Sequence, residues 1–360
     1  MQNFKKKICL IVDSLSDGGA ERVAALLSLE LGKFDYQVSI ICLRDEIQYF
    51  FQGELYNLGL NDSKIKIIKQ VSKFLKFKNA YNNTNADIYV DFRIRNRSLL
   101  ERLFHTFVFD LSKMIFTIHS FEVFYHIPKS KWFYAQYNKA HAIVGVSDAI
   151  VQKMQMLFPF KNLYYISNFS QSETSITYSS TLDINMPFIL AVGRLNNSTK
   201  QFDQLIDAYL QTNFFKAQFP LYIIGEGQDR GVLETQITHR ELGDYVHLLG
   251  YKSEVKHYMK LAKIVVMSSV VEGFPMVLLE ALTVGTPVVS FDCPSGPSEL
   301  IIDGENGILV ENQNFDALIN AMDKMHSDAE FYKHCKSNTI TSVEKFSAKN
   351  VISKWEQLLD

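Results

Sequence analysis

Short runs of apolar residues alternate with longer polar stretches along the chain. In the first half such runs occupy residues 7–13, 38–43, 88–92, 114–117 and 142–146. Runs this short and this uniformly apolar predict strands that are buried on both faces of a parallel sheet. After the first run, Val23, Leu27 and Leu31 stand near helical spacing, which predicts a helix over residues 20–33. The lysine-interleaved stretch 65–68 predicts one further strand.

The second half repeats this alternation. Apolar runs predict strands at 188–192, 221–224, 246–248, 264–267, 288–291 and 307–310, and helices are expected over 202–211, 230–242, 273–282 (after an initial turn) and 348–359. Residues 170–185 are rich in Ser and Thr and show no apolar periodicity. We therefore predict two doubly wound α/β domains, at 1–170 and 187–345, joined by a linker at 171–186.

The charges are divided unevenly between these halves. The 360-residue chain has a formal net charge of −2, which argues against a nucleic-acid-binding protein. Residues 1–170 carry 22 Lys and Arg against 15 Asp and Glu, whereas residues 171–360 carry 15 against 24. The balance is therefore +7 for the first half and −9 for the second, which predicts different partners for the two domains.

Cysteine usage and hydropathy exclude several other classes. Cys9, Cys42, Cys293 and Cys335 are scattered without C-x-x-C spacing, which favours buried, reduced thiols over disulfides or a zinc site. The apolar run at 8–12 is too short for the core of a signal peptide, and no apolar run reaches the length of a membrane span. We expect a cytoplasmic protein.

The stretch from Ser268 to Glu299 carries the most chemistry. Glu272 precedes a predicted helix, and Glu280 follows eight positions later on an apolar background. Two carboxylates so placed can accept hydrogen bonds from the hydroxyls of a sugar or a ribose. The alternative is structural, with Glu272 capping the helix and Glu280 in a surface ion pair.

Other candidates follow the ends of predicted strands. Arg194 and Lys200 come after one strand and suit a diphosphate, although ordinary surface charge is the alternative. Gly225 and Gly227 follow the next strand, but Arg230 stands where G-x-G-x-x-G needs its last glycine, so nicotinamide binding is weakly supported.

In the first half, Gly18 and Gly19 permit close approach to a ligand. His119 follows a predicted strand at its carboxyl end, and a lone histidine is more often structural than catalytic.

Taken together, these segments resemble the retaining, nucleotide-sugar-dependent glycosyltransferases of the GT-B fold, in particular the bacterial family 4-like enzymes. Glu272-Gly273-Phe274-Pro275 and Glu280 match the family's Glu-x7-Glu signature, and Gly193-Arg194 to Lys200 match its diphosphate-binding stretch. Gln201 stands where the family often has Gly. The resemblance implies two Rossmann-like domains that face each other across a cleft, with a C-terminal helix (346–360) that returns to the first domain.

The resemblance also implies roles. Arg194 and Lys200 would stabilise the diphosphate of the donor, Glu280 would bind the ribose, and Glu272 and His119 would lie near the donor sugar. The remaining donor contacts would come from Gly18, Gly19, Gly193, Gly225, Gly227, Gly273, Phe274, Pro275, Met276 and Val277. The donor would be a nucleotide sugar, most consistent with a UDP-sugar. Two fixed cations would replace a metal, and no Asp-x-Asp motif is present, so no cofactor and no metal ligands are expected.

A basic segment in the first half suggests a second surface. Six lysines without an intervening acid lie within fifteen residues, interleaved with apolar residues. We interpret Lys64, Lys66, Lys69, Lys73, Phe74, Lys76, Phe77 and Lys78 as a surface for a membrane or an acceptor. This predicts peripheral attachment to the anionic inner leaflet and a glycan or lipid-linked acceptor. The alternative is a solvated basic face beside a strand and a core helix.

The expected function is transfer of a hexose or N-acetylhexosamine in the assembly of a polysaccharide, a lipopolysaccharide or a glycoprotein oligosaccharide. Two alternatives remain. A soluble UDP-sugar epimerase would not need the Glu-x7-Glu signature or the Arg/Lys pair, and a non-catalytic glycan- or nucleotide-binding protein would not need the cationic pair.

Overall fold

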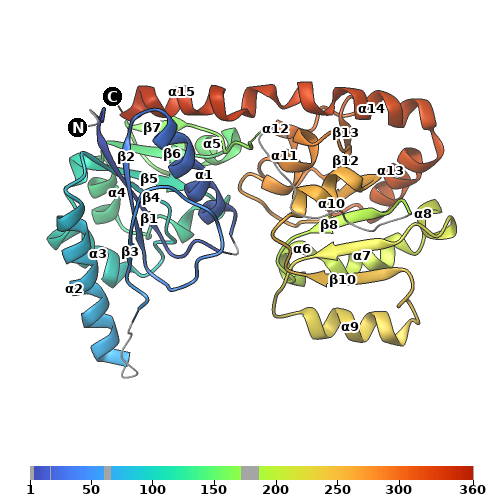
Figure 1. The fold of residues 1–360 in the computed structure, drawn as a ribbon, viewed down its shortest axis with the longest axis horizontal. Coiled ribbons are helices and arrows are strands. Elements are labelled where there is room, and N and C mark those ends of the chain that lie inside the picture. The colour runs from blue at the N-terminus through green and yellow to red at the C-terminus, as the bar shows by residue number, and fades with distance from the viewer. Residues whose placement is uncertain (1–3, 17, 61–65, 172–185, 360) are drawn as a thin grey trace. The chain divides into compact units, whose positions relative to one another are not determined.

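The computed structural model describes residues 4–16, 18–60, 66–171 and 186–359, and it consists of two compact units. Unit 1 combines residues 1–168 with 349–360, and unit 2 comprises residues 169–348. Each has its own parallel sheet with helices around it (Figure 1). The two α/β sheets confirm the predicted fold class. The predicted linker, 171–186, lies almost entirely outside the described residues.

The sheet of unit 1 has the order β3-β2-β1-β4-β5-β6-β7 in the part of the chain that is described. Its strands are β1 (Lys7–Val12), β2 (Gln37–Cys42), β3 (Glu54–Asn57), β4 (Ile88–Asp91), β5 (Met114–Ile118), β6 (Ala142–Gly145) and β7 (Leu163–Tyr165). Strands β4, β5 and β6 are buried along their whole length, as a parallel sheet covered on both faces requires. The order reverses between β1 and β4.

Helices and single turns connect these strands. They are α1 (Gly19–Lys33), α2 (Lys66–Thr84), α3 (Ser98–Phe107), η1 (Leu111–Lys113), η2 (Val123–Tyr125), α4 (Lys131–Tyr137) and α5 (Asp148–Leu157). The prediction of a strand at 65–68 is wrong, because the chain is helical from Lys66 onward. No Gly or Pro interrupts residues 60–84, so nothing in the sequence stops helix propagation.

The last helix of the chain, α15 (Ala348–Leu359), packs within unit 1. Val351, Ile352, Trp355 and Leu359 form its buried face. Lys5 Nζ lies 2.9 Å from Glu356 Oε1, and His141 Nε2 lies 2.8 Å from the carbonyl of Leu358. Both ends of the chain are therefore held at the same unit (Figure 1).

The sheet of unit 2 has the order β10-β9-β8-β11-β12-β13 among the described residues. Its strands are β8 (Ile189–Val192), β9 (Leu221–Ile224), β10 (Val246–Gly250), β11 (Ile264–Met267), β12 (Val288–Phe291) and β13 (Gly307–Val310). Its helical segments are α6 (Asn197–Lys200), α7 (Phe202–Tyr209), α8 (Asn213–Lys216), α9 (Arg230–His239), α10 (Val255–Leu261), α11 (Met276–Thr283), α12 (Pro297–Leu300), α13 (Phe315–Ser327), α14 (Ala329–Ser342) and η4 (Glu344–Phe346). The order reverses between β8 and β11, so the loops after these two strands flank the topological switch point, where such sheets bind ligands.

The four cysteines are buried free thiols, as the sequence predicted. Burial raises the pKa of Cys9 and of Cys293 to about 12, so both thiols stay protonated at neutral pH.

Candidate active site

The predicted donor residues of unit 2 gather at the switch point of its sheet. Gly193 and Arg194 directly follow β8, and Ser268 to Glu272 directly follow β11, the neighbouring strand. Parallel neighbours bring their carboxyl ends to the same edge, so segments about seventy residues apart in sequence become adjacent. A main-chain hydrogen bond of 2.9 Å from Val270 N to Thr199 O joins the two loops directly.

An ion pair between Lys200 and Glu272 is the central contact of this edge. Lys200 ends α6, and its Nζ donates to Oε1 of Glu272. The side chains keep 21% and 14% of their surface exposed, so the pair is partly shielded yet open to a ligand. Ser268 Oγ donates to the carbonyl of Lys200 at 2.7 Å and fixes the main chain behind the pair. Sequence reasoning placed both residues near one ligand, and the structure brings them into contact.

Arg194 lies two residues beyond β8 and is exposed at the same edge. A Cβ on Gly193 would stand 3.2 Å from Cε of Lys200, the end of a flexible side chain, so packing alone does not demand glycine at this position. Gly225 has φ +145°, and a Cβ would stand 1.9 Å from Gly193 O; a Cβ on Gly227 would meet Leu195 O at 2.3 Å. These two glycines allow the loops after β8 and β9 to touch, so packing already explains them, and their contact with a donor stays a prediction.

Gln201 has a left-handed backbone, with φ 52° and ψ 42°. It ends α6 and begins the turn into α7, which follows directly at Phe202. This conformation costs least for glycine, which explains why the resembled family often has Gly at this place.

The two glutamates of the signature do not have the structural roles considered as the alternative. Pro275 is the N-cap of α11, without a side-chain capping bond, and Glu272 pairs with Lys200 instead. Glu280 lies in the second turn of α11 and is only 4% exposed, so its side chain is buried and does not lie at the surface.

Residues between the glutamates serve mainly as packing. Phe274 and Met276 are buried, and the Phe274 ring meets Phe346 edge-on at 5.3 Å between centroids. Gly273 and Pro275 are buried as well, whereas Val277 is half-buried. These side chains therefore shape the loop from within, and its main chain is the part left to face a ligand.

The support behind this loop was missed in the sequence. Ser295 Oγ donates to the carbonyl of Gly273, and Gly296 lies so close that a Cβ would stand 2.4 Å from Cδ of Pro275. Gly296 has φ +95°, a conformation that favours glycine. The Pro-Ser-Gly-Pro run at 294–297 was the available signal, because it marks a tight turn beyond β12.

In unit 1 the corresponding switch lies between β1 and β4. Gly18 is the N-cap of α1, and Gly19 is its first residue and exposed. A Cβ on Gly18 would meet only the carboxylate of Glu21, the far end of a flexible side chain, so packing requires this glycine less strictly than Gly225. Asp13, which follows β1, accepts a 3.0 Å hydrogen bond from Ile94 N beyond β4 and joins the two strand ends.

His119 directly follows β5 at this edge. Its ring stacks on Phe92 at 5.3 Å, and both ring nitrogens are shielded from solvent with no hydrogen bond among the described residues. Burial, with a smaller effect of the Arg95 charge, lowers the pKa of His119 to about 3. A neutral imidazole with free nitrogens can donate to or accept from a sugar hydroxyl.

A buried ionic cluster that the sequence did not reveal lies behind His119. Arg93 donates to Asp91 at 2.7 Å and reaches Glu101 at 3.3 Å, and all three side chains are almost fully buried. Burial raises the pKa of Asp91, but the charges of Arg93 and Arg95 outweigh it and hold that pKa below its usual value. Arginines alternate along the chain at 93, 95 and 97, which was the available signal.

The basic segment differs from its prediction. Phe77 is 1% exposed and packs on Phe104 and Phe109, so its assignment to a membrane surface is wrong. Phe74 is half-buried and stacks on Phe104 at 5.5 Å. Both aromatic rings are held by α3 because their spacing places them on the inner face of α2.

The lysines of this segment are only partly described. Lys64 lies outside the described residues, and Lys66 and Lys69 lie where only the backbone of α2 is described. Lys76 donates to the carbonyl of Leu60 at 2.9 Å, and Lys73 lies 3.4 Å from the carbonyl of Leu43. Lys78 is half-buried.

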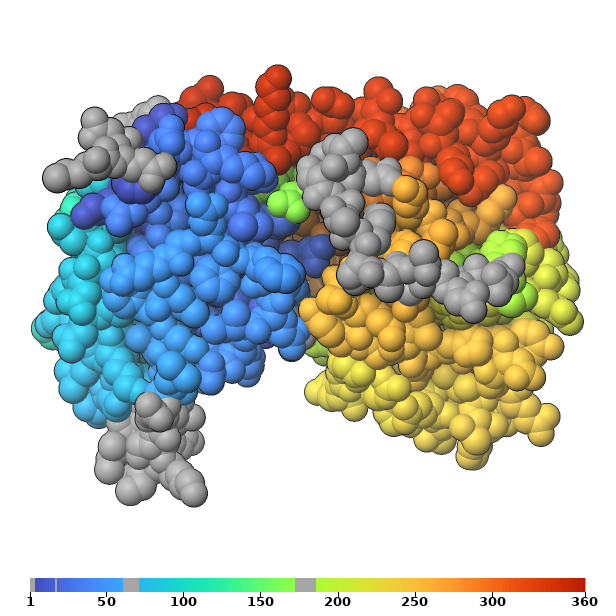
Figure 2. Space-filling model, viewed as in Figure 1, coloured from blue at the N-terminus to red at the C-terminus, as the bar shows by residue number. Residues whose placement is uncertain are grey.

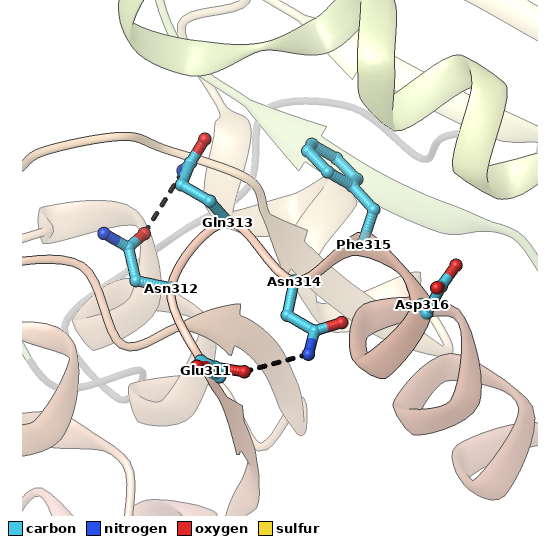
Figure 3. Close-up of a pocket in the computed structure, with 6 residues that line it drawn as sticks. All are labelled: Glu311, Asn312, Gln313, Asn314, Phe315 and Asp316. Carbon is cyan, nitrogen blue, oxygen red and sulfur yellow. Dashed lines mark hydrogen bonds between the residues drawn. The ribbon is translucent and has the colours of Figure 1, made fainter.

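A shallow hollow of about 410 Å³ lies elsewhere in unit 2, beyond the end of β13. Six consecutive residues line it: Glu311, Asn312, Gln313, Asn314, Phe315 and Asp316 (Figure 3). Asn314 donates to Glu311 at 3.0 Å and Gln313 to Asn312 at 3.2 Å, so these polar groups satisfy one another. No predicted site residue lies in it.

Comparison with known proteins supports the resemblance to glycosyltransferases. Residues 176–342, which cover most of unit 2, match the model of the family "Glycosyl transferases group 1". The amylovoran biosynthesis glycosyltransferase AmsD of Erwinia amylovora is 25% identical over 98% of this chain and 99% of its own. The chain is a glycosyltransferase, and residues 176–342 are the part that matches group 1.

Other matches to this glycosyltransferase also extend over nearly the whole chain. An N-acetylgalactosamine-N,N'-diacetylbacillosaminyl-diphospho-undecaprenol 4-alpha-N-acetylgalactosaminyltransferase of Campylobacter jejuni is 28% identical over 95% of this chain and 96% of its own. The solved structure of Anabaena HepE in complex with UDP-glucose superposes with a TM-score of 0.76 at 18% identity, covering 98% of each chain. These similarities confirm the GT-B fold.

No helix within the described ranges combines the length and the apolar character that crossing a membrane would require.

Proposed function

We propose that this glycosyltransferase is a retaining enzyme that moves a hexose or N-acetylhexosamine from a UDP-sugar to a glycan or lipid-linked acceptor. Assembly of a surface polysaccharide, a lipopolysaccharide or a glycoprotein oligosaccharide is the process that we infer. The names of the relatives support this, since one acts in amylovoran biosynthesis and another on a diphospho-undecaprenol-linked sugar. The UDP-glucose in the HepE structure supports the choice of donor.

The Lys200–Glu272 ion pair at the switch point carries this proposal. An incoming diphosphate competes with Glu272 for the ammonium group of Lys200, and Arg194 adds a second cation at the same edge. Negative charge grows on the diphosphate as the glycosidic bond breaks, so both cations stabilise the transition state more than the ground state. Glu272, released from Lys200, accepts hydrogen bonds from hydroxyls of the donor sugar, and the buried Glu280 accepts them from the ribose.

Retention follows from the resemblance to retaining GT-B enzymes. The acceptor hydroxyl attacks the face of the sugar that the diphosphate leaves, and a phosphate oxygen takes its proton. Such a reaction needs no pair of carboxylates at glycosidase spacing. We also propose that Arg194 and Lys200 do the work of a metal ion, so that EDTA leaves turnover unchanged.

Release of UDP from candidate UDP-sugars, with and without acceptor, tests the proposal. Lys200→Ala should lower turnover by at least about 100-fold, since one transition-state cation is lost. The matched control is Lys216→Ala, an exposed lysine of the same unit, which should leave turnover unchanged. Proton NMR of the product should show the anomeric configuration of the donor. Full turnover by Lys200→Ala, or an inverted product, would contradict the mechanism.

The same assays separate the alternatives. An epimerase would convert a UDP-sugar into its epimer without releasing UDP. A binding protein would show thermal stabilisation by the nucleotide sugar without any product. Thermal-shift screening with UDP-, GDP- and ADP-sugars identifies the base, and stabilisation by GDP-sugars alone would overturn the assignment of UDP.

We further propose peripheral association with an anionic bilayer, through a surface that differs from the predicted one. Val71 and Leu75 lie on the outer side of α2, and Leu99, Leu103 and Phe107 lie on the outer side of α3; all five are exposed. The two helices are joined by the ring contacts of Phe74 and Phe77 with Phe104, and both lie at the surface of unit 1 (Figure 2). Arg97, the N-cap residue of α3, and Arg102 on α3 are exposed nearby, which favours negatively charged lipid.

Flotation with vesicles containing anionic lipid, against neutral vesicles, tests this surface. Leu99→Glu and Phe107→Glu should abolish binding, whereas Met156→Glu, at an equally exposed apolar residue of α5, should not. Binding that is absent at low salt, or that survives both α3 substitutions, would overturn the proposal.

A further inference from the structure

The loop that begins at His119 is closed on itself by a second histidine. The main-chain N–H of His119 lies 3.4 Å from Nε2 of His126, at the far end of the loop. The other ring nitrogen of His126, Nδ1, lies 3.2 Å from the carbonyl oxygen of Arg93. A main-chain N–H can only donate, so Nε2 accepts. The neutral ring then carries its proton on Nδ1 and donates to Arg93, so one tautomer satisfies both contacts.

His126 is itself held rigidly. It is 3% exposed, and its carbonyl accepts from Tyr137 Oη at 2.9 Å and from Arg95 Nε at 3.1 Å. Burial, followed by the charge of Arg95, lowers the pKa of His126 well below 6.5, so the ring stays neutral at working pH.

Arg95 extends this support to the sheet. Its side chain is fully buried and donates to the carbonyls of Asp91 at 2.9 Å, Arg93 at 3.0 Å and Thr117 at 2.7 Å. Asp91 ends β4, and Thr117 is the next-to-last residue of β5. The guanidinium therefore ties the ends of two neighbouring strands to the far end of the His119 loop.

We propose that His126 is a positioning residue, which fixes the main chain of His119 and thereby orients the His119 imidazole toward the reacting sugar. This inference rests on the proposed function, because only the resemblance to retaining glycosyltransferases, on which that function rests, places His119 near the donor sugar. The geometry separates the tasks: His119 offers two ring nitrogens without partners among the described residues, whereas His126 uses both of its own on the protein. An error of about 1 Å in such a group is enough to slow catalysis greatly.

Two substitutions test the two hydrogen bonds of His126 separately. In His126→Gln the amide reaches about as far as Nε2 and keeps an acceptor for His119. In His126→Asn the shorter amide reaches only as far as Nδ1, so it keeps the donor to Arg93 and loses the bond to His119. We expect kcat per folded molecule to fall roughly tenfold in His126→Asn, with KM for the donor little changed, and to recover largely in His126→Gln.

The control is His141→Gln, since His141 also contacts a main-chain carbonyl in unit 1 but at the start of β6. Its kcat should equal that of the unaltered enzyme. Nitrogen NMR gives a readout that does not depend on activity. His126 should show a protonated Nδ1 and an unprotonated Nε2, and the amide proton of His119 should move upfield in His126→Asn but not in His126→Gln.

Each outcome decides a different question. If the unaltered enzyme releases no UDP from any UDP-sugar while the NMR signatures hold, the proposed function fails and the contact stands. If the enzyme is active and His126→Asn keeps full kcat per folded molecule, the positioning role is overturned. It is overturned as well if both substitutions lower activity to the same extent and this loss matches the loss of folded protein.

Discussion

At the scale of single residues, the informative positions are those where the sequence departs from expectation. Gln201 replaces the glycine that the resembled family often has, and the structure shows the left-handed backbone that makes glycine favourable there. The side chain is 7% exposed. The departure therefore costs backbone strain, and it leaves Lys200 in its place beside Glu272.

Substitution of Gln201 measures that strain. Gln201→Gly removes a left-handed penalty of about 1 kcal/mol but adds a similar entropy to the unfolded chain, so unfolding free energy should change by less than about 0.5 kcal/mol. Gln201→Val adds a β-branched residue at φ 52° and should destabilise by about 2 kcal/mol. Urea unfolding followed by circular dichroism compares the two. Equal stability of the Val and Gly variants would contradict the strain argument.

At the scale of elements, the central strands of both sheets and the edge strands of unit 2 were predictable, whereas the edge strands of unit 1 were not. Runs such as 264–267 and 288–291 have the same bounds as β11 and β12, because strands buried on both faces are uniformly apolar. β3 and β7 were missed, since they are short, half-exposed and mixed in sequence. The lysine-rich start of α2 was mistaken for a strand because the apolar spacing over four residues does not separate the two structures.

The candidate site was likewise predictable only in part. Strand ends and glycine loops could be located, so the order of Gly193, Lys200 and Glu272 predicted a common edge. The contacts that give the site its geometry could not be predicted. The Lys200–Glu272 pair depends on how two loops meet, and the buried bonds of Arg95 and His126 depend on three separate elements. Charged residues are usually exposed, so sequence alone favoured the surface for both Arg93 and Arg95.

The contribution of α15 to unit 1 can be tested at Trp355. Its side chain is 3% exposed on the buried face of the helix, so Trp355→Ala should lower the unfolding free energy of unit 1 by about 3–5 kcal/mol. The neighbouring Glu356 makes only a partly exposed ion pair with Lys5, so Glu356→Ala should cost less than about 1 kcal/mol. Urea unfolding monitored by the fluorescence of Trp132 provides the measurement. Equal effects of the two substitutions would show that α15 does not stabilise unit 1 by burial.

At the scale of the whole molecule, the two units differ in charge and in what they bury. The first half is basic and the second acidic, with balances of +7 for residues 1–170 and −9 for residues 171–360. In unit 1, His105, His119 and His126 have pKa values lowered by burial, the first two to about 3. Both tryptophans of the chain, Trp132 and Trp355, also belong to unit 1, so their fluorescence reports its unfolding alone.

The three buried histidines predict that acid destabilises unit 1. An unfolded histidine takes up a proton as the pH falls through 6.5, whereas these three folded ones do not, so the unfolded state binds more protons and gains stability. The loss is about 1.4 kcal/mol per histidine at a pH near 5.5. The raised pKa of Glu101 acts in the opposite direction, because the folded carboxyl takes up its proton at a higher pH than the unfolded one, and it offsets part of this loss.

The measurement is the midpoint of urea unfolding at about pH 7.5 and 5.5, followed by tryptophan fluorescence. The midpoint followed by circular dichroism, which reports both units, is measured for comparison. The tryptophan midpoint should fall steeply with acidification. His105→Phe should remove about a third of the fall, because the His105 ring stacks on Phe116 and neither of its nitrogens has a hydrogen bond in the described structure. That variant should also be at least as stable at neutral pH, since no buried polar group is left unsatisfied. If the tryptophan midpoint does not move with pH, or if it falls as steeply in His105→Phe as in the unaltered protein, the histidines take up protons within the folded unit.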